Sequence, residues 1–238
     1  MDKRAVVLLS GGIDSTTCLA DAVQTYGADK VLALSMYYGQ KHEKEIESAK
    51  KVAQYYGVDH IIQRISGAFD LSDCTLLQGR GEVAHESYAE QLHEMGGEGT
   101  VATYVPFRNG LFLSYAAAIA ASIHANVVYY GAHADDAAGR AYPDCTPKFE
   151  KAMNAAIYEG TGKIVQMHTP LLNWNKSQVV AYGLKLGAPY HLTWSCYEGG
   201  DKPCGTCGTC IDRIKAFEAN GVEDPARDYG TFFTEEDR

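Results

Sequence analysis

Basic charge is scarce in this chain, which has 21 lysines and arginines against 30 aspartates and glutamates and a formal net charge of -9 over 238 residues. Proteins that wrap nucleic acid depend on clustered lysine and arginine to displace counterions from the phosphates. We therefore expect no direct binding to nucleic acid. A local basic pocket for a small anion is still compatible with this composition.

Long hydrophobic runs are also missing. The longest near-apolar run, residues 111–123, is interrupted by Ser114 and Ser122. It is shorter than the roughly 20 residues that a membrane-spanning helix needs, so it predicts a buried helix and no membrane partner. The first residues, MDKRAVVLLSGG, lack the features of a secretory signal. We therefore expect a cytoplasmic protein whose seven cysteines are thiols and not disulfides.

The sequence has no internal repeat and no low-complexity tract, and its length fits one domain or one domain with a small appendage. Short apolar runs alternate with helical patterns. Strands are predicted at 5–9, 31–36, 58–65, 126–130 and, from a weaker pattern, 164–167. Helices are predicted from the apolar positions between 18 and 26, at about 46–57, and near 109–124. Strands separated by helices pair in parallel, so the sequence predicts a doubly wound α/β fold with a mainly parallel sheet.

Two stretches interrupt this alternation. Residues 78–103 contain five glycines and mixed charge with poor periodicity, which predicts a long loop or lid. The cysteine-rich stretch after Trp194 is incompatible with a place in the sheet. We expect domain 1–190 to bind the nucleotide, 191–225 to be a metal-binding segment packed on it, and 226–238 to be a tail.

A glycine loop follows the first predicted strand, with the sequence Ser-Gly-Gly-Ile-Asp-Ser at residues 10–15. Ligands bind at the carboxyl ends of strands in open α/β sheets, and a glycine-rich turn at a helix N-terminus can hold a phosphate. The alternative is a tight turn with Asp14 or Ser15 as the N-cap of the helix. The loop matches neither G-x-x-x-x-G-K-[ST] nor G-x-G-x-x-G.

This string resembles the S-G-G-x-D-S loop of the ATP pyrophosphatase (PP-loop) family. The resemblance implies an adenine nucleotide alpha hydrolase-like fold, ATP held by its β,γ-pyrophosphate, and transfer of AMP to an oxygen of a second substrate. Mg²⁺ is then expected to neutralise the charge of the leaving pyrophosphate.

Four of the seven cysteines are clustered, at Cys196, Cys204, Cys207 and Cys210. They supply four thiolates within one loop, which satisfies tetrahedral Zn²⁺ and leaves no position for a substrate. The pattern therefore predicts one structural zinc per chain. An iron–sulfur cluster and unliganded thiols are the alternatives.

Four further segments extend the resemblance: MYYGQKH at 36–42, YVPFRN at 104–109, YPDC at 142–145 and LTWSC at 192–196. With the glycine loop and the cysteines they resemble the QueC family of 7-cyano-7-deazaguanine synthases, up to about Pro225. That family converts 7-carboxy-7-deazaguanine and ammonia to the nitrile with ATP, in queuosine biosynthesis. The resemblance implies that the chain forms a homodimer. It also implies that the binding partners are these small molecules. Thr146 and His133 depart from the family pattern.

The resemblance assigns ATP binding to Leu8, Leu9, Ser10, Gly11, Gly12, Ile13, Asp14, Ser15, Thr16, Thr17, Cys18 and Met36. It suggests Asp14, Ser15 and Arg108 as catalytic residues. Candidate substrate contacts are Gln40, Arg108, Asn109, Tyr142, Asp144 and Lys176. For these contacts the alternatives are a surface charge at Arg108, an ordinary turn at 142–144, a solvated Lys176 at the start of a helix, and a structural Gln40.

Two other functions compete with this one. A PP-loop tRNA-thiolating enzyme would hold an iron–sulfur cluster and carry a basic surface or an RNA-binding domain, which the acidic charge disfavours. A non-enzymatic nucleotide-binding or zinc-ribbon module is the third candidate.

Overall fold

The computed structural model describes residues 2–226 except 66, 82–84, 86, 87, 95 and 98. Its centre is a five-stranded sheet in the order β3-β2-β1-β4-β5, in which every pair is parallel. The strands are β1 (Ala5–Leu8), β2 (Val31–Tyr37), β3 (Asp59–Arg64), β4 (Val127–Tyr129) and β5 (Gln166–His168). The prediction of a doubly wound parallel α/β fold is confirmed.

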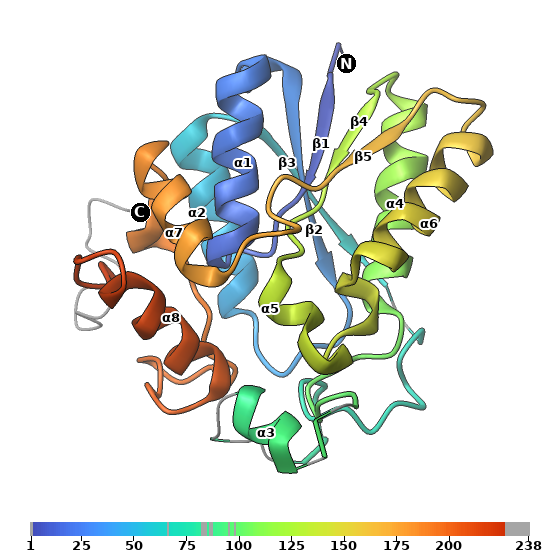
Figure 1. The fold of residues 1–238 in the computed structure, drawn as a ribbon. Coiled ribbons are helices and arrows are strands. Elements are labelled where there is room, and N and C mark those ends of the chain that lie inside the picture. The colour runs from blue at the N-terminus through green and yellow to red at the C-terminus, as the bar shows by residue number, and fades with distance from the viewer. Residues whose placement is uncertain are drawn as a thin grey trace.

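Helices cover both faces of the sheet (Figure 1). On one face lie α1 (Ile13–Tyr26), α2 (Lys44–Tyr56), α7 (Lys176–Lys185) and α8 (Gly208–Glu218), and on the other lie α4 (Arg108–Ser122) and α6 (Pro147–Gly160). Strand β1 is buried between them: Ala5 and Val7 pack with the first group, and Val6 packs with the second. A central parallel strand is apolar on both faces for this reason.

Local sequence sets several helix ends. Helix α2 stops where Gly57 adopts a left-handed conformation at φ +64°, as glycine does at many helix C-termini. Helix α7 begins with a capping box between Asn175 and Gln178. Thr146, one of the two departures from the family pattern, is the N-cap of α6 and accepts a hydrogen bond from the Phe149 amide at 3.2 Å.

The structure differs from the sequence predictions in two regions. Helix α3 (Tyr88–Glu94) lies inside the stretch predicted as loop, several residues of which are outside the described part of the chain. The prediction that all four clustered cysteines lie in one loop is wrong, because Cys210 belongs to the first turn of α8. The predicted tail, 226–238, lies outside the described residues apart from Ala226.

Short helical turns complete the chain: α5 (Ala134–Ala137), η1 (Ala28–Lys30), η2 (Ala138–Arg140), η3 (Pro143–Cys145) and η4 (Tyr190–Leu192). Among the described residues no helix combines the length and the apolar character that crossing a membrane requires.

The cysteine segment, residues 191–225, is packed into the main core. Ala216 and Phe217 of α8 join the apolar cluster of α1 and α7. Arg213 is almost fully buried and forms a two-pronged ion pair with Asp224, at 2.7 and 2.9 Å. The segment therefore contributes side chains to the core that the sheet and its helices share.

Candidate functional site

A cavity opens at the carboxyl ends of β1, β2 and β4, where the strand order reverses direction. This point of a doubly wound sheet is where ligands bind, because the loops after neighbouring strands turn to opposite faces and leave a crevice. The cavity walls include Ser10 after β1, Met36 of β2 and Tyr130 after β4. The site predicted from the glycine loop thus coincides with the cavity.

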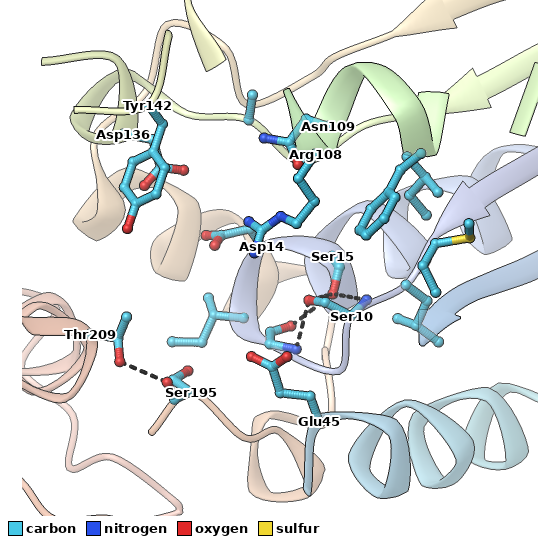
Figure 2. A pocket seen from close by; sticks show the side chains of 18 of the residues that line it. Ser10, Asp14, Ser15, Glu45, Arg108, Asn109, Asp136, Tyr142, Ser195 and Thr209 are labelled. Atoms are coloured by element: carbon cyan, nitrogen blue, oxygen red, sulfur yellow. Dashed lines mark hydrogen bonds between the residues drawn. The ribbon is translucent and has the colours of Figure 1, made fainter. Parts of the chain in front are cut away.

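The phosphate loop, residues 10–15, is folded by its own hydroxyls (Figure 2). The Ser10 amide donates to Ser15 Oγ at 3.1 Å, the Gly12 amide donates to Ser10 Oγ at 3.2 Å, and Ser15 Oγ donates to the Gly12 carbonyl at 3.2 Å. Gly12 is the N-cap of α1 and no side chain caps that helix, so neither Asp14 nor Ser15 has the alternative capping role. The helix therefore presents an uncapped, electropositive N-terminus to the cavity.

Gly11 explains why this loop needs a glycine. Its φ is +89°, and a Cβ there would lie 2.3 Å from the Glu45 carbonyl oxygen and 2.7 Å from the Ala49 nitrogen. Helix α2 thus packs backbone to backbone against the loop, which no larger residue permits.

The residues assigned to ATP divide into two groups. Leu8, Leu9, Ser10, Gly12, Ile13, Asp14, Ser15 and Met36 line the cavity. Gly11 is part of the loop but faces the α2 backbone and not the cavity, and Thr16, Thr17 and Cys18 are fully buried beneath the loop. Thr17 is hydrogen-bonded to Tyr190 at 2.7 Å, which gives it a structural role.

A charge cluster lies beside the phosphate loop. Lys176 Nζ is 2.8 and 2.6 Å from the two carboxylate oxygens of Asp14, although 162 residues separate them in sequence. Burial opposes ionisation of Asp14, but the ammonium of Lys176 and the nearby His133 lower its pKa below the usual value. Lys176 is thus held in the site and is not a solvated surface lysine, since its side chain is only 19% exposed.

His133 and Asp136 extend this cluster. His133, the second departure from the family pattern, lies 3.3 Å from Lys176 Nζ and 3.3 Å from an Asp136 oxygen. Burial raises the pKa of Asp136. Asp135 and Asp212 also line the cavity. Sequence reasoning missed these three aspartates, because only the fold brings them to the phosphate loop.

Arg108 begins α4 and reaches into the cavity from the other side (Figure 2). Its Nη1 donates to the Tyr38 hydroxyl at 3.0 Å, and its guanidinium lies 5.5 Å from the centroid of that ring. Among the described residues no carboxylate forms an ion pair with it. A half-buried guanidinium without a counter-ion in a cavity is suited to an anionic ligand.

The turn before Arg108 is strained. Phe107 has φ +56°, a left-handed conformation that is rare outside glycine, and its amide donates a hydrogen bond to the Tyr104 hydroxyl at 2.9 Å. Such conformations persist where the surroundings fix them and cluster at functional sites. Here the turn directs Arg108 into the cavity.

The other candidate substrate contacts are placed differently from one another. Asn109, Tyr142 and Gln40 line the cavity. The Tyr142 hydroxyl is hydrogen-bonded to the Thr103 hydroxyl at 2.6 Å. The Gln40 side chain accepts a hydrogen bond from the Tyr38 amide. Asp144 is buried and is not among the lining residues. It accepts hydrogen bonds from the Asn109 amide and side chain, at 2.9 and 3.2 Å, and so supports the start of α4. A direct contact of Asp144 with substrate stays a prediction.

Glu45, in the first turn of α2, is a site residue that sequence reasoning missed. It lines the cavity, and burial raises the pKa of its carboxyl to about 7 even though the positive charge of Arg108 acts in the opposite direction. Its position five residues after Gln40, a candidate substrate contact, could have identified Glu45 as a site residue. A glutamate at that position is also typical of the first turn of an ordinary helix.

The four clustered cysteines bring their sulfurs within 4.8 Å of one another, as predicted, and three of the four residues are buried. The amides of Cys204 and Cys207 donate to the sulfurs of Cys196 and Cys204, at 3.3 and 3.2 Å. Tetrahedral zinc with sulfur bonds of about 2.3 Å separates its ligands by roughly 3.8 Å, so small rearrangements fit the set to one metal ion. The cluster could hold a metal.

The cysteine cluster adjoins the cavity. Trp194, Ser195 and Thr209 line the cavity wall, and Thr209 donates to the Ser195 carbonyl at 2.7 Å (Figure 2). The Trp194 amide donates to the Gly11 carbonyl at 2.9 Å. The cysteine segment is therefore both a wall of the site and a direct neighbour of the phosphate loop.

Comparison with known proteins gives a consistent result. A family model described as "Queuosine biosynthesis protein QueC" matches residues 4–221. A protein of Archaeoglobus fulgidus is 47% identical over 93% of this chain and 89% of its own length, and one of Oceanobacillus iheyensis is 41% identical over 94% and 98%. One of Thermoplasma acidophilum is 42% identical over 97% and 95%. All three carry the name 7-cyano-7-deazaguanine synthase.

A solved structure of NMN synthetase from Francisella tularensis is similar to this chain with a TM-score of 0.52 and 18% identity, over 97% of this chain and 82% of that one. At this identity the likeness concerns the fold alone.

Proposed function

The chain belongs to the QueC family of queuosine biosynthesis proteins, and on this premise we propose that it converts 7-carboxy-7-deazaguanine and ammonia to 7-cyano-7-deazaguanine with ATP. Its close relatives are named for synthesis of that nitrile. In terms of reaction class we propose an ATP-dependent C–N ligase that also carries out the dehydration of the amide.

The observation that carries the proposal is the pairing of an uncapped phosphate loop with an unneutralised Arg108 across one cavity. An enzyme that adenylates a carboxylate must hold two anions together, the triphosphate and the acid. The uncapped end of α1 suits the first, and the guanidinium suits the second.

We propose two rounds of activation at the same loop. The substrate carboxylate attacks the α-phosphorus of ATP, pyrophosphate leaves, and ammonia displaces AMP from the acyl carbon to give the amide. The amide oxygen then attacks a second ATP, and loss of AMP with the remaining N–H protons gives the nitrile. Each round turns a poor leaving group into AMP, which is why one site can serve both.

In this proposal the phosphate loop binds the pyrophosphate part of ATP through Ser10, Gly12 and Ser15. Lys176 is oriented by Asp14 and balances charge at the departing pyrophosphate. Asp14 and Asp136 are the residues that would hold Mg²⁺, which often binds through one or two carboxylates together with substrate phosphates. The ion would supply charge neutralisation there.

The apolar wall at Met36 and Leu34 is our proposed place for adenine. Asn109, Tyr142 and Gln40 are then left for the deazapurine, and we propose Asp144 as a positioning residue because its carboxylate supports the start of α4.

We further propose that the metal of the cysteine segment is zinc, with Cys196, Cys204, Cys207 and Cys210 as its ligands and a structural role. Four thiolates close the coordination sphere, so the ion has no open position for chemistry. The same proposal divides the chain into a nucleotide-binding domain at 1–190, a metal-binding segment at 191–225 and a tail at 226–238. It includes a cytoplasmic location, which keeps these thiols reduced. It also includes the homodimer that the family resemblance implies.

The decisive assay incubates the purified protein with 7-carboxy-7-deazaguanine, ATP, Mg²⁺ and ammonium, and follows the nitrile by mass spectrometry. We expect nitrile, with AMP and pyrophosphate formed only when the acid is present. Release of ADP, or AMP formation that does not depend on the acid, would refute the proposal. Metal analysis separates the tRNA-thiolating alternative, which requires iron and acid-labile sulfide.

A further inference from the structure

Glu45, like Asp135 and Asp212, is a carboxyl group of the cavity for which the roles above provide no use. It comes from the first turn of α2, and Figure 2 shows it beside the phosphate loop. Among the described residues its carboxylate has no hydrogen bond and no ion pair. It is half-buried, so it is partly withdrawn from water without a partner.

The backbone of Glu45 packs closely on the phosphate loop, because a Cβ at Gly11 would lie 2.3 Å from the Glu45 carbonyl oxygen. This contact fixes the start of the Glu45 side chain beside the loop. The carboxyl group is therefore carried into the same cavity as whatever the loop binds.

The proposed reaction needs a group of this kind. At neutral pH most ammonia is ammonium, which has no lone pair to attack with, so a proton must be removed before the C–N bond can form. Arg108 and Lys176 are cations and cannot accept it. Asp14 is neutralised by Lys176, and its lowered pKa makes it a weaker base than Glu45.

The surroundings of Glu45 suit proton transfer near neutrality. Burial raises the pKa of Glu45 to about 7, while the positive charge of Arg108 on α4 partly opposes this. The other ionisable groups of the wall nearby are Tyr38, after β2, and Lys41 and His42, ahead of α2. A base whose pKa lies close to the working pH is the most effective.

We propose, on the basis of the function proposed above, that Glu45 binds the ammonium ion and removes a proton from it before attack on the acyl adenylate. The nitrogen gives one proton to the Glu45 carboxylate and uses the freed electron pair to form the C–N bond. The bond from carbon to the phosphate-bearing oxygen breaks, and AMP leaves with the electron pair of that bond. The extra proton on nitrogen passes to the departing phosphate, which leaves a neutral amide.

Glu45→Gln tests this role, because glutamine keeps the size and hydrogen-bonding capacity of the side chain but is not a base. With ammonium as the nitrogen source we expect kcat/KM for ammonium to fall by roughly 10²- to 10⁴-fold, the range for loss of a general base. Wild-type activity should rise with pH through about 7 and then level off, whereas the activity of the variant should follow only the fraction of free ammonia and keep rising. Glu47→Gln, an exposed residue of the same helix turn, is the matched control and should match the wild type.

The reaction with hydroxylamine distinguishes loss of a base from a structural defect. Hydroxylamine is largely neutral at pH 7, so it attacks the acyl adenylate without prior deprotonation. Glu45→Gln should form the hydroxamate at close to the wild-type rate. It should also keep exchange of labelled pyrophosphate into ATP in the presence of the acid and the absence of any amine, since adenylation precedes the step assigned to Glu45.

The outcomes separate the two proposals. If the wild type shows no acid-dependent exchange, the proposed function fails, whatever Glu45 does. If the wild type exchanges but Glu45→Gln loses exchange, or loses hydroxylamine and ammonium reactions equally, Glu45 holds the deazapurine or the loop and the ammonium role is overturned. Selective loss of the ammonium reaction with exchange intact is the result we expect.

Discussion

The phosphate loop and the cysteine segment meet at one cavity, but they are held in place by different forces. The loop follows the central strand β1 and is fixed by sterics and short-range hydroxyl bonds, with Gly11 pressed on α2. The cysteine segment contains the buried pair Arg213–Asp224 and four clustered cysteines that could hold a metal. One wall of the site therefore depends on the sheet, and we propose that the other depends on a metal and an ion pair.

This difference implies that the two walls can be damaged separately. Metal loss should loosen the wall at Trp194, Ser195 and Thr209 while the parallel sheet stays folded. Damage to the loop should abolish nucleotide chemistry while the metal stays bound. The backbone hydrogen bond from the Trp194 amide to the Gly11 carbonyl is one direct link through which one wall can affect the other.

The largest effect is expected from Cys207→Ser, which removes a central thiolate of the cluster. Structural zinc is worth roughly 10–16 kcal/mol in small zinc domains, so its loss should unfold the cysteine segment. We expect loss of bound metal, of activity and of solubility, measured by elemental analysis and sedimentation. Cys74→Ser, at a buried cysteine outside the cluster, is the control. Full zinc content in Cys207→Ser would contradict the four-ligand site.

The next effect concerns the Asp14–Lys176 pair beside the loop. Asp14→Ala leaves the Lys176 ammonium largely buried with its main partner gone, and breaking a buried pair in this way costs roughly 3–5 kcal/mol. We expect a lower urea midpoint and no turnover, with the metal retained. The partial exposure of both side chains, 24% and 19%, places the cost at the low end of that range.

Adding Lys176→Met to Asp14→Ala separates stability from chemistry. The double variant removes the unpaired charge, so the urea midpoint should recover in part while turnover stays absent. Equal stability of the single and double variants would show that Asp136 compensates the lysine. Recovery of turnover would remove both residues from the proposed nucleotide site.

Gly11→Ala should have a smaller effect, on stability as well as on activity. A non-glycine residue at positive φ costs roughly 1–3 kcal/mol, and the new Cβ must also push the α2 backbone away. We expect a lower melting temperature and weaker pyrophosphate exchange. Gly12→Ala is the matched variant for stability alone, because its φ is −85° and the nearest atom to its Cβ would be 3.4 Å away. Equal destabilisation of the two variants would contradict the packing argument.

The contrast between the walls also explains what the sequence could predict. The strands and the phosphate loop are local patterns, namely an apolar run, two glycines and a serine-bearing turn, and the structure has them where expected. The four cysteines are close in sequence, so their convergence was predictable too. Lys176 and Asp136 join the loop only through the fold, because the strand order brings the ends of β4 and α7 beside β1. Their pairing therefore could not be read from spacing.

Other outcomes have equally local causes. The family resemblance suggests Asp144 as a substrate contact, which stays a prediction, and in the structure its carboxylate accepts a hydrogen bond from the Asn109 amide at the start of α4. Nothing in the sequence near Asp144 identifies a partner 35 residues away. Helix α3 was missed because its seven residues are flanked by glycine-rich stretches that mask helical periodicity.

The smallest predicted effect tests the wall formed by the cysteine segment without changing any of the four cysteines. Thr209→Val deletes the hydroxyl that donates to the Ser195 carbonyl at 2.7 Å while keeping the shape of the side chain. Loss of one hydrogen bond costs about 1 kcal/mol, which lowers the melting temperature of a protein of this size by roughly 2–4 °C. Because Thr209 and Ser195 line the cavity on the cysteine side, KM for the deazapurine should rise while KM for ATP stays unchanged. Ser122→Ala, which removes an exposed hydrogen bond within α4, should change neither constant. If KM for ATP rose instead, the two walls would not be separable, and the link from Trp194 to Gly11 would have to transmit the change to the phosphate loop.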